Sequence, residues 1–259
     1  MSALIHKTAF AAAGPQAEWI LPLAGRVRDL GREIGLPNIA VAADISSPEP
    51  MLGPDGRPLA ETVFEWIDPK LEYWKDRGFA LRAPFVLASR YTAEPFFYTG
   101  GRFATWRPAP RLESIPVRSA AESFGVGAAV IAPAHLPGGV IGSVVWAGTA
   151  SRPDLPQVFA ERAAELHYAV LRLMAAYHED AGGPPVRLTR REIQCLKWAA
   201  AGKTDQEIGQ IIHVAHATVR FHLQNAAVKL GASGRAQTLH RASALGYIGM
   251  PRQAGAPGA

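Results

Sequence analysis

The sequence predicts an α+β protein of two domains, a helix/sheet/helix sandwich over residues 1–180 and a four-helix domain over residues 187–259. Three observations support this prediction. Strand-like and helical patterns alternate before residue 180, only helical patterns follow residue 187, and a Gly/Pro-rich stretch at 181–186 is typical of a linker. A chain of 259 residues is long enough for two ordinary domains.

The first domain begins and ends with an amphipathic helix. Apolar residues recur every three to four positions over 16–34 and again over 155–177, which predicts one buried face on each helix. The segments between them predict a sheet with shorter helices and loops, because apolar runs are separated by Pro, Gly and Asp. The expected elements are a strand at 38–45, a loop at 46–58, a helix from Pro69 within 61–77, strand-like segments in 83–98 broken by Pro84 and Pro95, a loop at 107–111, a helix at 117–124, and strands at 126–132 and 140–147 joined by a turn at 135–139.

The positive charge of the chain is concentrated in the second domain. From Arg187 to the end there are ten Lys and Arg residues against three Asp and Glu, whereas the first 186 residues have 17 against 19. A small basic domain joined to a near-neutral one suits a polyanionic partner, because Lys and Arg that bind phosphates release condensed counterions. Nucleic acid is favoured over a membrane surface.

Other classes of site receive little support. Cys195 is the only cysteine and lies in a helical pattern, so we expect it to pack in the core, and neither a disulfide within the chain nor a Cys-rich zinc site can form. His135 has no second His or Cys at ligand spacing, and no catalytic motif is visible. We expect no metal, no cofactor and no enzyme activity. The N-terminus lacks the pattern of a secretory signal and the apolar stretch 126–146 is interrupted by Pro and Gly, so we expect a cytoplasmic protein without a membrane partner.

The second domain contains two capping boxes. Thr189 with Glu192, and Thr204 with Glu207, have the spacing at which Thr caps the third helical amide and Glu bonds back to the amide of the Thr. The pattern predicts helices that begin at these boxes, with the second spanning 205–212, a turn over 213–216, a third helix at 217–230 and a fourth at 235–245. Gly202 and Gly231 end the first and third helices.

The third of these helices has two different faces. Val219, Leu223, Ala226 and Leu230 fall on one side and are expected to pack, whereas Phe221, Gln224 and Asn225 lie opposite, flanked by Arg220 and Lys229. No acidic residue occurs from Ala215 to Arg235. An arginine that can pair with guanine, a glutamine that can pair with adenine and an aromatic ring that can contact thymine predict a DNA recognition helix in the major groove.

The same residues carry a family resemblance. The segments 188–198, 202–204 and 218–225, with Glu207-Ile208, resemble the LuxR-type helix-turn-helix signature. The resemblance implies that Arg220, Phe221 and Gln224 approach base edges, that Lys203, Thr204 and Thr218 meet phosphates, and that the last helix forms a homodimer on a two-fold site in double-stranded DNA. Ala215 departs from the family, in which a serine commonly caps this helix.

The first domain resembles the autoinducer-binding domain of quorum-sensing LuxR regulators, a sandwich of helices around a sheet. The likeness rests on 124–127 with 133–142, and on 78–80 with Ala83-Pro84. It implies that Ala83 and Lys70 replace the aspartate and the tryptophan that bind the lactone signal. The other pocket positions that it implies are apolar or aromatic: Trp66, Trp74, Phe85, Tyr98 and Val145, with Ala129 in place of a glycine.

Loss of these anchors would leave the amide and carbonyl groups of an acyl-homoserine lactone unpaired, at about 1–3 kcal/mol each. The sequence therefore predicts a cavity that accepts another hydrophobic small molecule, with Lys70 available to an acidic group, or a core that its own aromatic side chains fill. Two alternatives stay open: a regulator that binds these lactones in another way, and a response-regulator-like protein controlled by a partner.

Overall fold

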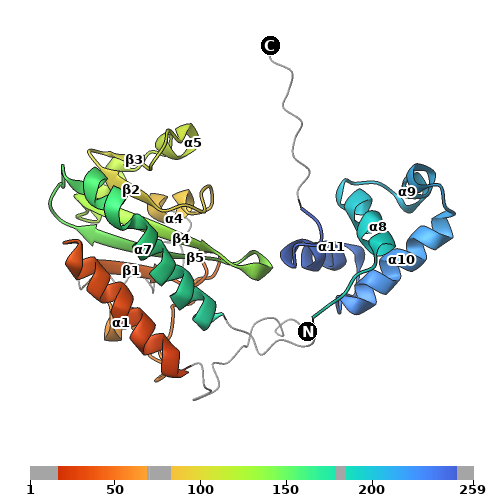
Figure 1. The fold of residues 1–259 in the computed structure, drawn as a ribbon, viewed down its shortest axis with the longest axis horizontal. Helices are drawn as coiled ribbons and strands as arrows, with labels where there is room; N and C mark the ends of the chain where they lie inside the picture. The colour runs from red at the N-terminus through yellow and green to blue at the C-terminus, as the bar shows by residue number, and fades with distance from the viewer. Residues whose placement is uncertain (1–16, 69, 71–82, 179–184, 250–259) are drawn as a thin grey trace, which may run out of the picture. The chain divides into compact units, whose positions relative to one another are not determined.

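The structure is a computed structural model that describes residues 17–68, 70, 83–178 and 185–249 (Figure 1). The chain divides into two compact units. The first contains a five-stranded sheet with its helices, and the second contains the four helices from α8 to α11. Most of the expected linker, the expected helix from Pro69, Trp74 and residues 78–80 lie outside the described residues.

The sheet of the first unit is antiparallel throughout. Its strands are β1 (Asn38–Ala42), β2 (Phe96–Thr99), β3 (Arg102–Ala104), β4 (Ala128–His135) and β5 (Ile141–Gly148), arranged in the order β1-β5-β4-β2-β3. The central pair β4 and β5 is joined through the short helix η2 (Pro137–Gly139), with Ala128 opposite Gly148 and His135 opposite Ile141. This sheet differs from the alternating parallel strands expected of a response-regulator receiver domain.

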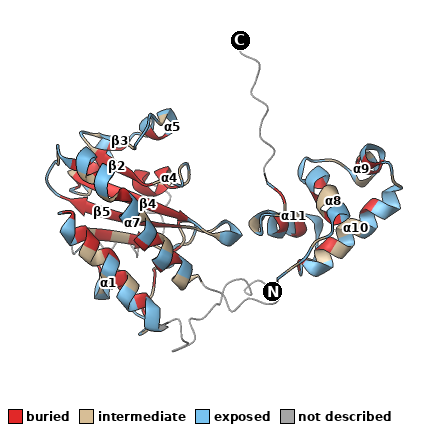
Figure 2. Ribbon diagram, viewed as in Figure 1, coloured by how far each residue is buried: buried red, intermediate tan, exposed pale blue. Residues whose placement is uncertain are grey.

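Both faces of the central strands are buried (Figure 2). On one face, Val130 and Trp146 pack against the helices α1 (Ala17–Glu33) and α7 (Leu155–Tyr177). On the other face, Ile131 and Val145 pack with residues of the short helices α4 (Pro84–Ala88), α5 (Pro110–Glu113) and α6 (Arg118–Ser123). Successive strand residues alternate between the two cores, which explains why the strands are apolar without interruption. The helix/sheet/helix sandwich predicted from the sequence is confirmed.

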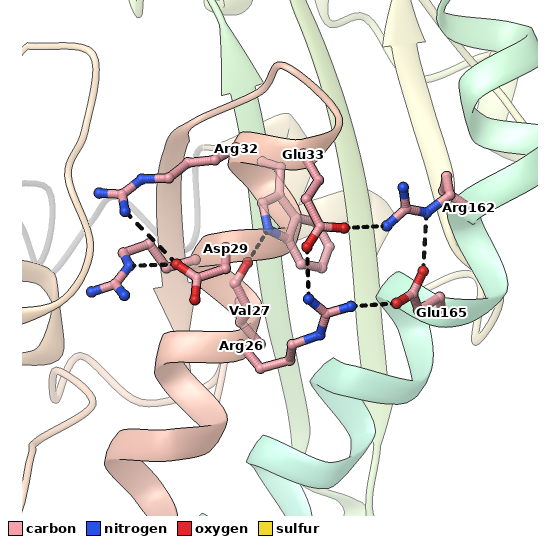
Figure 3. Close-up of polar contacts among 9 residues, drawn as sticks. Arg26, Val27, Asp29, Arg32, Glu33, Arg162 and Glu165 are labelled. Atoms are coloured by element: carbon pink, nitrogen blue, oxygen red, sulfur yellow. Dashed lines mark hydrogen bonds and ion pairs between the residues drawn. The ribbon is translucent and has the colours of Figure 1, made fainter.

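Helices α1 and α7 lie side by side and are joined by a closed set of ion pairs (Figure 3). Arg26 bonds to Glu33 at 2.7 Å and to Glu165 at 2.5 Å, and Arg162 bonds to the same two carboxylates at 2.6 and 3.0 Å. Each arginine therefore links both helices. These side chains are partly exposed to solvent, so the network fixes how the helices pair more than it adds to stability.

The structure differs from the sequence prediction near the prolines. Pro84 begins helix α4, with Ala83 in an extended conformation at the N-cap, because proline at the first helical position has the required φ and needs no amide hydrogen. Pro133 lies inside β4, beyond the residues that pair with β2, where its missing amide hydrogen does no harm. Strand β4 continues past this proline, so His135 is its last residue and not part of the turn. Strand β1 ends at Ala42, three residues earlier than predicted. Three short elements were not expected: α2 (Leu59–Thr62), β3, and α5, which begins inside the expected loop at 107–111.

The second unit is a four-helix domain whose boundaries agree closely with the sequence pattern. Its helices are α8 (Arg190–Ala200), α9 (Asp205–Ile212), α10 (His216–Lys229) and α11 (Arg235–Ala244). Both capping boxes are formed, with Thr189 and Glu192 at α8 and Thr204 and Glu207 at α9. Gly202 and Gly231 follow α8 and α10 with φ of 83° and 61°, values that glycine adopts without strain. None of the described helices of the chain is long and apolar enough to cross a membrane.

Candidate DNA-reading helix and ligand-binding cluster

The turn between α9 and α10 is shaped by three residues. His213 ends α9 in the left-handed conformation, with φ 55° and ψ 50°, and its amide donates to the carbonyl of Gly209. The amide of Val214 donates to the same carbonyl at 2.9 Å. A Cβ on Gly209 would lie 2.7 Å from the carbonyl oxygen of Val214, so the chain passes too close to α9 there for a side chain. The two helices therefore join through a tight turn, as in a helix-turn-helix motif.

Helix α10 is held against α8 by its buried face and by a charged pair. Val219 and Ala226 are fully buried, and Leu223 packs with residues of the other three helices in two adjoining clusters. At the far end of α10, the ammonium of Lys229 lies 2.8 and 2.9 Å from the two carboxylate oxygens of Glu192. The sequence predicts Lys229 as a DNA contact, but in the structure its charge already neutralises a buried carboxylate.

The opposite face of α10 is open to solvent. Phe221 is 57% exposed between the exposed residues Arg220 and Gln224, while Asn225 is only partly exposed. Val228, one turn further along, is 80% exposed. A large aromatic ring among hydrogen-bonding side chains, on a helix without acidic residues, presents to a partner the groups that read base edges.

The residues predicted to meet phosphates lie at the starts of α9 and α10. Lys203 is bonded to Glu207 at 3.1 Å, and the hydroxyl of Thr204 belongs to the capping box of α9, whereas Thr218 is exposed in the first turn of α10. Lys203, Thr204 and Arg220 line one surface pocket with His216 and Arg235. The structure thus brings three of the predicted DNA contacts, Lys203, Thr204 and Arg220, to one surface pocket of the second unit.

The residues predicted to line a ligand cavity fall into two groups. Trp66, Phe85, Tyr98 and Val145 are buried in a single cluster on the α4 side of the sheet, and Ala129 lies in the same cluster. Ala83 is also buried, but it packs with Ile45 and Val86 in a smaller cluster. Lys70 is exposed, outside both clusters. The contact between Lys70 and an acidic group of a ligand stays a prediction.

Aromatic rings meet edge to face within this cluster. The ring of Phe85 lies 5.9 Å from that of Tyr98 and 5.7 Å from that of Phe103, and Phe96 lies 5.2 Å from Phe103. Burial raises the pKa of the Tyr98 phenol above its ordinary value. The described part of the cluster is thus apolar and aromatic.

Sequence reasoning missed a buried polar pair beside this cluster. The hydroxyls of Ser89 and Ser143 lie 3.0 Å apart, both buried, and the hydroxyl of Ser89 also bonds to the carbonyl of Phe85. Nε2 of His135 lies 3.0 Å from the carbonyl oxygen of Ser89 and so ties the end of β4 to α4. Only the placing of two serines within apolar segments could have suggested the pair. No group of three His, Cys, Asp or Glu side chains among the described residues is placed to hold a metal ion.

Two family models match the chain. The model described as "Autoinducer binding domain" matches residues 28–177, and the model described as "Bacterial regulatory proteins, luxR family" matches residues 186–242. The chain belongs to the LuxR family of quorum-sensing transcriptional regulators. This LuxR-type regulator has the ligand-binding and DNA-binding domains of its family, as the sequence signature predicted.

Relatives of known name agree with this assignment. The LuxR-type chain is 39% identical over 138 residues to the "HTH-type quorum sensing-dependent transcriptional regulator VjbR" of Brucella ovis, a match that spans about half of each chain (51% and 52%). It is 27% identical over 248 residues to the "Transcriptional activator protein SolR" of Ralstonia nicotianae, with 93% and 96% covered. A crystal structure of Escherichia coli SdiA is 24% identical, with a TM-score of 0.42 over 69% of this chain and 73% of that one. VjbR and SolR are both named as proteins that regulate transcription.

Proposed function

We propose that this chain binds a two-fold site in double-stranded DNA as a homodimer and thereby regulates transcription, with α10 in the major groove. The observation that carries the proposal is the exposed row of Arg220, Phe221 and Gln224 on a helix whose opposite side is buried. We assign contacts with the phosphates that flank those bases to Thr218, Lys203 and Thr204. The last helix, α11, ends beside Leu245, which is 53% exposed and offers apolar surface to a second copy of the chain.

A DNA-binding measurement on one arginine tests this assignment. Duplexes that the full chain selects from a random library are compared with scrambled duplexes by fluorescence anisotropy. Arg220→Ala should weaken binding of the selected duplex by about 1–3 kcal/mol and relax base preference at one position of each half-site. Lys197→Ala is the matched control, because it removes the same charge from an exposed position on α8. If the Arg220 variant discriminates between sequences as well as the control does, α10 is not the reading helix.

Salt dependence gives an independent check of the phosphate contacts. Each neutralised phosphate releases counterions, so the affinity of the full chain for DNA should fall steeply as the salt concentration is raised. Thr218→Ala leaves the charge of the chain unchanged but removes one hydroxyl from the proposed backbone contact, so it should weaken selected and scrambled duplexes alike. A flat response to salt would contradict the assignment of Lys203 and Arg220 to a DNA-binding surface.

For the first unit, we propose that the sensing domain does not hold its ligand by the usual lactone anchors. The support comes from residue types and burial. Ala83 is 1% exposed and has no carboxylate, while Phe85 and Val145 have no hydroxyl to offer. Such a site either accepts a hydrophobic small molecule that needs few polar partners or is filled by its own side chains. The edge-to-face contacts of Phe85 favour the filled state for the part of the cluster around that ring.

Mass spectrometry distinguishes these possibilities. The full chain, purified from its native host and denatured in organic solvent, should release either one apolar compound in near-stoichiometric amount or none. Recovery of an acyl-homoserine lactone at that ratio would instead support the family's usual signal, bound in another way. A Val145→Trp variant is the control, since a larger side chain in the buried cluster should exclude a compound that occupies it.

A further inference from the structure

The carboxylate of Asp205 lies between two arginines from two other helices. Asp205 is the first residue of α9, and one of its oxygens, Oδ1, lies 2.6 Å from Nη1 of Arg235 on α11. The other oxygen, Oδ2, lies 3.7 Å from Nε of Arg220 on α10. Only 21% of the Asp205 side chain is exposed, against 62% for Arg220. One carboxylate therefore links the first turn of α9 with the helix that is proposed to read DNA.

A second bond fixes the arginine that holds this carboxylate. Nη2 of Arg235 donates to the carbonyl oxygen of Lys203 at 2.6 Å, while Nη1 of the same guanidinium bonds to Asp205. Because the guanidinium is planar, two bonds at its fork determine its orientation. Arg235 therefore holds Oδ1 of Asp205 in place and leaves Oδ2 directed toward α10.

The contact on Arg220 is made by a nitrogen that base reading does not need. An arginine reads guanine when its donors form a fork on O6 and N7, and the two terminal nitrogens can form that fork. The ion pair with Asp205 involves Nε. It can restrict the rotamers of the long Arg220 side chain while the terminal nitrogens stay available, which lowers the entropy lost when the side chain docks on a base.

The negative charge of Asp205 cannot raise the affinity of this surface for DNA in general. Asp205 is one of only three acidic residues from Arg187 to the end of the chain, and it lies in a pocket with Lys203, Arg220 and Arg235. A carboxylate at a surface that meets phosphates repels the polyanion and partly cancels two arginine charges. As a first-turn acid it also stabilises α9, but an exposed acid elsewhere in that turn would do so without touching Arg220.

We infer that Asp205, held by Arg235, is a positioning residue that directs Arg220 toward its base and so raises sequence discrimination while lowering affinity for DNA in general. The inference rests on the proposed function of α10. Its effect on discrimination passes through Arg220, whereas its repulsion of phosphates lowers affinity for any duplex and persists without Arg220.

A double-mutant cycle on the full chain separates the two effects. Dissociation constants for a selected and a scrambled duplex are measured for the wild type, Asp205→Asn, Arg220→Ala and the double variant. Asp205→Asn should tighten binding of the scrambled duplex several-fold. Discrimination, which is the dissociation constant of the scrambled duplex divided by that of the selected duplex, should fall about three- to tenfold; this quotient is the ratio used below. In the Arg220→Ala background, the same change should leave that ratio unaltered.

A second variant tests whether Arg235 is needed to hold Asp205 in place. Arg235→Gln keeps the charge of Asp205 but releases it, so discrimination should fall here too, without the gain in general affinity. Asp205→Asn keeps the capping box of Thr204 and Glu207, and amide exchange in α9 verifies that the helix is retained. An unchanged ratio in Asp205→Asn, or an equal drop with and without Arg220, overturns the inference alone. If Arg220→Ala leaves discrimination intact, the proposed function of α10 fails as well.

Discussion

Glu192 places a carboxylate in the interior of the second unit, where its side chain is only 3% exposed. Burial alone would raise its pKa, but bonds from Lys229 and from the backbone and hydroxyl of Thr189 outweigh burial and hold the pKa below its usual value. The folded state therefore keeps Glu192 ionised. This contribution to stability is present above the pKa of the unfolded chain and is lost as the pH falls through the lower pKa of the folded one.

Removal of Lys229, the cation that bonds to Glu192, should reveal how the stability of the second unit depends on pH. Lys229→Met leaves a buried carboxylate without its cation, and because Lys229 is itself 37% exposed we expect a loss of about 2 kcal/mol in the stability of the second unit. The difference in stability between the wild type and Lys229→Met should shrink as the pH falls and Glu192 becomes protonated in both proteins. Amide hydrogen exchange in α8 and α10 measures the loss, and Lys197→Met on the exposed side of α8 should show almost none.

The sequence predicted the residue types on α10 well but not which charges are already engaged. A helical wheel places Arg220 and Lys229 equally on the flanks of the reading face, because it contains no information on neighbouring helices. In the folded unit Lys229 meets Glu192, 37 positions away, and Arg220 meets Asp205. Such pairings depend on tertiary structure, so the DNA-facing surface could be predicted from the sequence as a face but not as a list of free charges.

At the scale of single elements, α10 begins without a side-chain cap. Ala215 is the N-cap residue, in an extended conformation with φ −63° and ψ 145°, and it makes no capping bond from its side chain. Ala215→Ser should stabilise the second unit by about 1 kcal/mol, because the serine oxygen can accept from an amide in the first turn. Chemical unfolding or amide exchange in α10 measures the gain. Ala217→Ser, inside the same exposed turn, should not reproduce it.

The capping interaction at the start of helix α9 should depend on pH. The backbone and hydroxyl of Thr204, together with Lys203, lower the pKa of Glu207 to about 2. Since the folded pKa lies below the ordinary value of 4.5, the capping interaction should be fully present above about pH 4.5 and be lost as the pH falls toward 2. NMR titration of the Glu207 carboxyl measures this pKa directly, and a midpoint near 4.5 would contradict it. The stability difference between wild type and Glu207→Gln should narrow over the same range.

The elements that could be predicted are those whose signals are local. Both capping boxes, the glycines after α8 and α10, and the long periodic patterns of α1 and α7 determined those helices from the sequence alone. The segment around Pro84 could not be predicted in this way, since this proline can end a strand or begin a helix. Only the packing of Phe85 and Ala88 against the sheet decides between them. Strand β3 has three residues, too few for a period to be visible.

At the scale of the whole molecule, the two units divide the chemistry between them. The unit with the antiparallel sheet carries two apolar cores, and the four-helix unit carries the excess of positive charge. The charge split and the linker composition predicted two domains, whereas the capping boxes and the residue types on α10 were needed to predict DNA binding for the second. The sequence could not decide whether the aromatic cluster around Phe85 encloses a ligand, because the same apolar residues can line a cavity or fill a core.

One substitution tests whether the loss of a lactone anchor explains the chemistry of the first unit. If Ala83 stands where a carboxylate would bind the amide of an acyl-homoserine lactone, the wild type should gain no thermal stability from these lactones at any acyl chain length. Ala83→Asp should gain some, in a chain-length-dependent way, because a hydrogen bond to a charged group contributes about 1.5–3 kcal/mol. Ala83→Asn is the matched control, since it has the same shape without the charge. The position is also the N-cap of α4, so both variants can cap that helix, and only a lactone-dependent difference between them supports the assignment. Equal melting curves for the two variants in every lactone, by calorimetry, would show that Ala83 does not lie at the signal's amide.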